Sequence, residues 1–137
     1  MPNLPSNVTF LAAVQGLSVS GVDRAYKFPP ASVDISNGYA SFPTMPDSSR
    51  GEQVSTCIDN SKIRNIGYVV IIEATGQDIQ EDNYLKLAAV MDNIETALDG
   101  LVTTANIIEY ELSTSGNYLI GDSAYWAVIA NITARDI

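Results

Sequence analysis

The residue types that usually carry chemistry are rare in this sequence. It contains no histidine and one cysteine, Cys57. Histidine is the commonest general base near neutral pH and the commonest metal ligand, so its absence excludes His-dependent triads and most zinc sites. A cysteine without histidine also lacks the usual activated thiolate pair, and on an expected strand it is typical of a small buried hydrophobe. Neither residue type indicates a catalytic centre.

Two glutamates have a spacing that a glycosidase could use. Glu109 and Glu111 lie two apart on an expected strand, so their side chains point to the same face. Ile108, Tyr110 and Leu112 alternate with them, which is typical of a strand with one face in water. No sugar-binding aromatic residues accompany the pair, so the sequence favours a solvated strand face over catalysis.

Other motifs of catalysis or ligand binding are equally weak. Asp78, Glu81 and Asp82 lack the repeated oxygen ligands and central glycine of a calcium loop, and the first two predict a helix capping box instead. No Gly-Lys-Ser or Gly-Lys-Thr is present to hold a nucleotide phosphate. We therefore expect no catalytic residue, no metal site and no cofactor, and we expect that the protein is not an enzyme.

Hydrophobic spacing predicts the elements of the first half of the chain. Phe10, Val14 and Leu17 follow the possible N-cap Ser6 at helical spacing, which predicts a short amphipathic helix. Val22 to Tyr26 predicts a short strand. Residues 29–50 contain four prolines and predict a long irregular loop, in which only Tyr39 to Phe42 resembles a strand. The four prolines are Pro29, Pro30, Pro43 and Pro46.

The second half has the clearest patterns. Residues 66–74 form an apolar, β-branched run typical of a central strand covered on both faces. Leu87, Met91, Ile94 and Leu98 recur at helical spacing and predict one long helix over about 79–99.

The remaining sequence predicts an antiparallel meander. Its expected strands are 107–113, 118–120 and 124–134, and its expected turns are 115–117 and 121–122. The order of elements predicts an α+β fold with a mostly antiparallel sheet, the long helix packed on one face and the short N-terminal helix nearby.

Bulk composition narrows the class of protein. The chain has 137 residues, which predicts one domain over 1–137. Its net charge of −9 opposes binding to nucleic acid or anionic lipid. A single cysteine suits a reducing cytoplasm, and we expect no secretory signal and no contact with membrane.

The order of elements resembles a known family. The chain combines a short amphipathic N-terminal helix, the passage Gly21-Val22-Asp23-Arg24-Ala25-Tyr26-Lys27-Phe28-Pro29-Pro30-Ala31-Ser32, a central apolar strand, a long helix and a closing strand with Tyr125-Trp126. This pattern is similar to the tail terminators of long-tailed phages of the lambda type. In that family a small acidic α+β subunit forms a ring that caps the tail tube and joins it to the head.

The resemblance implies a function by assembly. It implies a homohexameric ring in the neck of a virion, built in the host cytoplasm, with the tail tube protein and the head–tail connector proteins as partners. DNA would pass through the channel only as cargo. Two alternatives stay open: another neck or head-completion connector subunit, and a protein-binding adaptor that forms no ring.

The scarce cations are the candidate contact residues. On an acidic subunit they suit acidic patches of a partner, although isolated surface charges usually contribute little. Tyr125 is a further candidate, because Trp126 beside it is expected to face the core. The candidate subunit and partner interface therefore consists of Arg24, Lys27, Arg50, Arg64 and Tyr125.

Overall fold

A five-stranded sheet with two helices makes up the described part of the chain. The computed structural model describes residues 7–33, 35, 38–52, 61–74, 80–101 and 106–136. Its helices are α1 (Asn7–Gln15) and α2 (Gln80–Asp99). Its strands are β1 (Val22–Ala25), β2 (Tyr39–Glu52), β3 (Ser61–Ala74), β4 (Asn106–Ile120) and β5 (Ser123–Asp136).

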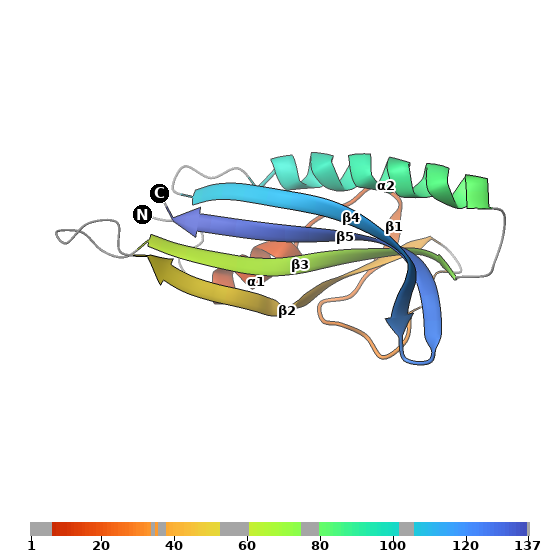
Figure 1. Cartoon of the computed structure of the whole chain (residues 1–137), viewed down its shortest axis with the longest axis horizontal. Coiled ribbons are helices and arrows are strands. Elements are labelled where there is room, and N and C mark those ends of the chain that lie inside the picture. The colour runs from red at the N-terminus through yellow and green to blue at the C-terminus, as the bar shows by residue number, and fades with distance from the viewer. Residues whose placement is uncertain are drawn as a thin grey trace.

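The strands follow the order β1-β2-β3-β5-β4 across the sheet (Figure 1). β1 and β2 are parallel, whereas the other three neighbouring pairs are antiparallel. The expected α+β class is therefore confirmed, with a mostly antiparallel sheet, one long helix and a short N-terminal helix. The apolar run at 66–74 lies in the central strand β3, as expected, but this strand begins earlier, at Ser61.

Both helices cover the same face of the sheet, which we call the first face. Phe10 and Val14 of α1 and Val90 and Ile94 of α2 are fully buried in one cluster. The strands contribute alternate residues to it, such as Val70 of β3, because successive side chains of a strand point to opposite faces. The helical spacing in the sequence therefore predicted the buried side of both helices correctly.

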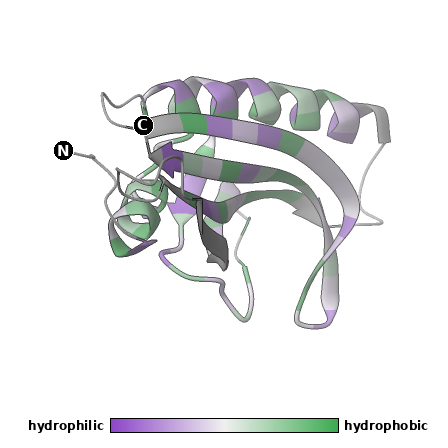
Figure 2. Cartoon of the chain, turned by 60° about the vertical axis from the view of Figure 1, so that its left-hand side comes forward, coloured by the Kyte–Doolittle hydropathy of each residue, from purple (hydrophilic) through white to green (hydrophobic). Residues whose placement is uncertain are grey.

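A smaller cluster covers part of the opposite face, which we call the second face. Phe42, Val69 and Ala127 are buried there, and Val33 and Ile35 from the segment before β2 pack against them. The far end of the β4–β5 hairpin bends out of the plane of the sheet (Figure 2). There the Tyr118 ring meets the Phe42 ring, with centroids 6.2 Å apart. The bent hairpin and the preceding segment thus enclose this end of the second face.

The expected loop at 29–50 is wrong over its second half. β2 runs from Tyr39 to Glu52 through Pro43 and Pro46, and its register shifts around both prolines. Proline is tolerated on an edge strand because only one side of the strand needs donors. β1 pairs with β2 only as far as Ser41, so the prolines lie where β2 has β3 on one side and no described strand on the other.

The expected turn at 115–117 is also wrong. β4 continues through this stretch to Ile120, and the ladder with β5 absorbs the irregularity as a register shift between Ser115 and Tyr118. A bulge of this kind bends a strand without ending it. The chain turns only at Gly121-Asp122, where Gly121 has a φ of 60° that glycine adopts at little cost.

Candidate interaction surfaces

The structure separates the five candidate contact residues. Arg24 is exposed on β1, and Arg50 lies ten residues along β2 from Ala40, the partner of Arg24. At about 3.3 Å per residue, the distance along β2 from Ala40 to Arg50 is roughly 30 Å, so the two cations do not form one patch. The side chain of Arg50 lies outside the described part of the structure.

Lys27 lies just after β1 and is exposed. Its ammonium group donates to the carbonyl oxygen of Gln15 at 3.4 Å, and the Gln15 amide donates to the carbonyl oxygen of Lys27 at 2.7 Å. These two contacts hold the end of α1 against the segment after β1. Lys27 therefore has a role within the fold as well as an exposed position.

Arg64 is buried in the single chain, and its place in an interface stays a prediction. Only 7% of it is exposed. It shares the first face of β3 with Ile66 and Tyr68, because residues two apart on a strand point the same way. A long aliphatic stem lets arginine pack along apolar surface in this way.

Tyr125 is half-buried against the smaller cluster on the second face. Its neighbour Trp126 packs on the other side, where its ring meets the Tyr84 ring edge-on at 5.9 Å between centroids. Tyr84 is 58% exposed, so this aromatic pair reaches the surface at the start of α2. Tyr84 was not among the predicted contact residues, although its place three residues before Leu87 puts it beside the buried stripe.

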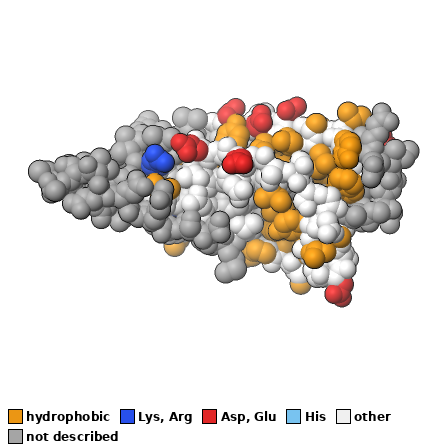
Figure 3. Space-filling view, viewed as in Figure 1, with side chains coloured by type: hydrophobic (Ala, Val, Ile, Leu, Met, Phe, Trp, Pro, Cys, Tyr) orange, Lys and Arg blue, Asp and Glu red, His pale blue; other side chains and the backbone are white. Residues whose placement is uncertain are grey.

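The two glutamates at 109 and 111 lie as expected on one exposed face of β4. Together with Asn131 and Thr133 of β5 they line a shallow hollow of about 190 Å³ on the second face. Figure 3 shows this face, with apolar side chains gathered over the half nearest the bent hairpin and acidic side chains mainly along the upper edge and left of centre. The hollow is open and polar, which agrees with a solvated strand face.

Tyr110 points the other way, toward α2. Partial desolvation raises its pKa, and the carboxylates of Asp99 and Glu95 on α2 raise it further. The outer side of α2 is an acidic surface. Its exposed carboxylates belong to Asp82, Asp92, Glu95 and Asp99.

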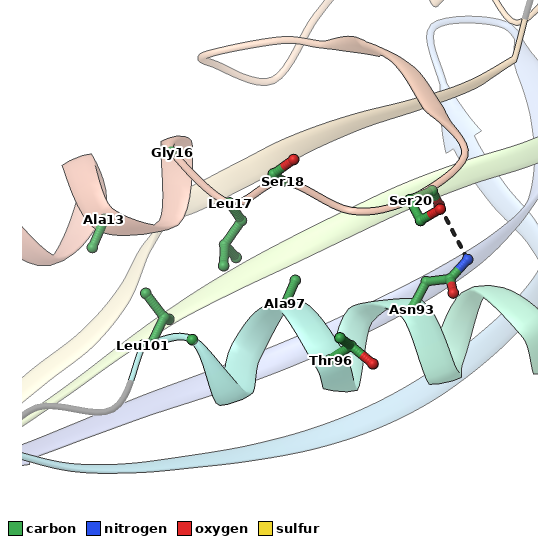
Figure 4. A pocket seen from close by; sticks show the side chains of 10 residues that line it. Ala13, Gly16, Leu17, Ser18, Ser20, Asn93, Thr96, Ala97 and Leu101 are labelled. Carbon is green, nitrogen blue, oxygen red and sulfur yellow. Dashed lines mark hydrogen bonds between the residues drawn. The ribbon is translucent and has the colours of Figure 1, made fainter.

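A groove of about 430 Å³ runs between the end of α1 and the second half of α2 (Figure 4). Asn93 crosses it, because its side-chain amide donates to the carbonyl oxygen of Ser20 at 3.1 Å. The described lining of the groove carries no ionisable side chain. It therefore offers shape and a few amide and hydroxyl groups, and no acid–base chemistry.

Two further findings concern the described residues alone. They contain no group of three or more cysteine, aspartate or glutamate side chains arranged to hold a metal ion. No helix among them is long and apolar enough to cross a membrane.

The sequence was also compared with known proteins. No protein-family model matches the chain, and no curated protein matches it.

Proposed function

We propose that this protein is a tail terminator of a long-tailed phage, a structural subunit that forms a ring, caps the tail tube and joins it to the head connector. The family resemblance of the sequence suggests this function. The observation that carries it in the structure is that the described sheet ends in two unlike edge strands, β1 and β4. A subunit with two unlike surfaces can bind copies of itself head to tail, and such contacts close into a ring when the rotation between neighbours allows it.

Surface charge supports passage of DNA through the ring. The chain carries 16 acidic against 7 basic residues. The exposed carboxylates on the outer side of α2 repel phosphate, so a channel lined by such a surface lets DNA slide without binding it. The protein would then act in the neck of the virion, after assembly in the host cytoplasm.

Ring formation is tested on the purified full chain. Light scattering coupled to size exclusion is expected to give a mass near six times the 14.7 kDa of one chain. Negative-stain images are expected to show rings with a central opening wide enough for double-stranded DNA. A protein that remains monomeric at high concentration in physiological salt would overturn the ring and favour an adaptor.

A second experiment tests the position of the protein within the virion. Labelled protein is mixed with tail tubes and, separately, with head connectors of the virus that encodes it. A tail terminator binds one end of the tube and then recruits the connector. Binding to the connector alone would overturn the tail terminator and identify another neck subunit.

A further inference from the structure

The two open edges of the sheet carry opposite charges on the same face. Arg24 of β1 pairs with Ala40, whose side chain is buried in the cluster on the second face. Paired residues on neighbouring strands point to the same side, so Arg24 also points to the second face. Glu109 and Glu111 of β4 line the hollow on that face. The Arg24 cation, which follows Asp23 on β1, and the two glutamates of β4 therefore lie at opposite edges of one surface.

The edges differ in their capacity to accept another strand. Beyond Ser41 the open side of β2 contains Pro43 and Pro46, which have no N–H to donate to a new neighbour. β4 spans fifteen residues without proline, and no described strand lies beyond it. β4 therefore offers the longest run of backbone groups for pairing with another chain.

Pairing of β4 with β4 of a second copy is unfavourable in one register. A two-fold antiparallel pair centred near Tyr110 would bring Glu109 and Glu111 of each copy opposite the same residues of the other. Like charges on directly facing strands destabilise a sheet, and natural proteins use edge charges to prevent such pairing. The same carboxylates favour an edge that carries a cation.

We propose that β4 of one copy lies beside β1 of the next copy, with Glu109 and Glu111 next to Arg24 of the neighbour on the second face. This contact is heterologous, so it continues the sheet from copy to copy in one direction. The inference rests on the proposed ring and specifies the surfaces that build it.

The strand register sets how the neighbours are displaced. Four pairings join Arg24 to β4 across one sheet: Arg24 with Ala40, Ala40 with Ile71, Ile71 with Ala127, and Ala127 with Ser115. Arg24 is therefore level with Ser115, and Glu111 lies four residues away, or about 13 Å along the strand. Contact between Arg24 and Glu111 therefore requires each copy to be shifted by about this distance along the strands relative to its neighbour. Strands that are tilted relative to the axis of a closed assembly have such a shift.

Charge reversal tests the contact in the full chain. Arg24→Glu and Glu111→Arg are each expected to raise the concentration at half assembly roughly tenfold, because each replaces an opposite-charge pair by a like-charge pair. The double variant restores an opposite-charge pair with the charges exchanged. Its concentration at half assembly is expected to lie within about threefold of that of the unaltered protein. Asp122→Arg, at the exposed turn between β4 and β5, is a matched control for Glu111→Arg, with no expected change. Circular dichroism of every variant checks that the fold is intact.

Cross-linking tests the direction of the contact. In a Cys57→Ser background, the double variant with Arg24→Cys and Glu111→Cys is expected to oxidise into a ladder of linked chains. The two positions lie at opposite edges of a five-stranded sheet, roughly 20 Å apart at least, so they cannot form a disulfide within one chain. Each single variant is expected to stay unlinked.

The outcomes separate the two proposals. Rings that form with unchanged strength in both charge reversals overturn the contact and leave the ring standing. Dimers linked by Glu111→Cys alone also overturn it, because they require a two-fold pairing of β4 with itself. Unaltered protein that stays monomeric overturns both the ring and the contact.

Discussion

Gly67 of β3 marks a place where two strands leave no room for a side chain. Its backbone N–H donates to the hydroxyl oxygen of Thr44 on β2 at 2.9 Å. A Cβ atom at Gly67 would lie 2.7 Å from that oxygen and 3.0 Å from the Thr44 methyl carbon. The shifts of register around Pro43 and Pro46 accompany this close approach, so a local feature of β2 fixes the residue type on β3.

Replacing Gly67 by alanine is expected to lower the free energy of unfolding by about 1–3 kcal/mol, because the added methyl group overpacks the contact. Urea denaturation measures the change. Thr44→Ala in the same chain removes the clashing atoms, so the two substitutions together are expected to cost less than their sum. Gly16→Ala is the control, since its Cβ would meet atoms only at ordinary contact distances of 3.5 Å and above. Strictly additive effects would contradict this account of the contact.

Tyr68 has a buried phenol group whose titration can be tested directly. It is 2% exposed on the first face, and burial raises the pKa of its phenol above 10.0, with a smaller opposing effect from the Ser41 hydroxyl. The unfolded chain therefore loses the phenol proton near pH 10 while the folded protein keeps it. The stabilising contribution is complete below pH 10 and is lost as the pH rises through the folded pKa.

Tyr68→Phe is expected to flatten the fall of the free energy of unfolding above about pH 10. Urea denaturation at several pH values measures the slope. Tyr118 is half-buried and its pKa is also raised by burial, so Tyr118→Phe is a control with an effect of the same sign. An unchanged slope in the Tyr68 variant would contradict a buried phenol at this position.

At the scale of elements, α2 contributes to the fold through one stripe of side chains. Leu87, Val90, Ile94 and Leu98 are buried against the sheet, whereas Leu85 on the outer side is 65% exposed. The helix is otherwise rich in charge, so its apolar stripe must supply most of its attachment to β3 and β5. Replacing a buried leucine and an exposed leucine of α2 by alanine therefore separates the effect of packing on stability from the effect of helix propensity.

Leu98→Ala is expected to lower the free energy of unfolding by about 2–5 kcal/mol, because it removes a buried side chain and leaves a cavity. Leu85→Ala is expected to change it by less than about 0.5 kcal/mol, since that side chain is in water. Thermal or urea unfolding of both variants gives the comparison. Equal losses would show that α2 does not pack on the sheet through this stripe.

At the scale of the whole molecule, two electrostatic effects act on assembly in opposite directions. Copies with a net charge of −9 repel one another at long range, whereas the proposed contact joins opposite charges at short range. Salt screens the long-range repulsion first, because the Debye length falls from about 30 Å at 0.01 M to about 10 Å at 0.1 M. Higher salt then weakens the close pairs as well.

Assembly is therefore expected to be strongest at intermediate ionic strength, roughly 0.1–0.2 M, and weaker on either side. Light scattering at fixed protein concentration over a salt series measures it. Arg24→Glu is expected to lose the decline at high salt, because it lacks the attractive pair. Assembly that grows steadily up to 1 M salt would instead indicate a contact dominated by apolar surface.

Local patterns in the sequence predicted both helices, the central strand and the turn at Gly121-Asp122. These features depend on residues close together in the chain, through helical spacing, β-branched runs and glycine conformation. Residues 53–60 and the capping residues Ser6 and Asp78 lie outside the described part of the structure.

The tertiary structure decided what depends on neighbours far along the chain. Pro43 and Pro46 fit inside β2 only because β1 leaves that side of the strand open, and a spacing rule cannot know which strand lies beside another. Burial of Arg64 follows from the side of β3 that the helices cover. Arg24 and Glu111 lie far apart in the sequence, and three strands separate them in the sheet. They point to the same face because paired residues on neighbouring strands do so across each of these ladders.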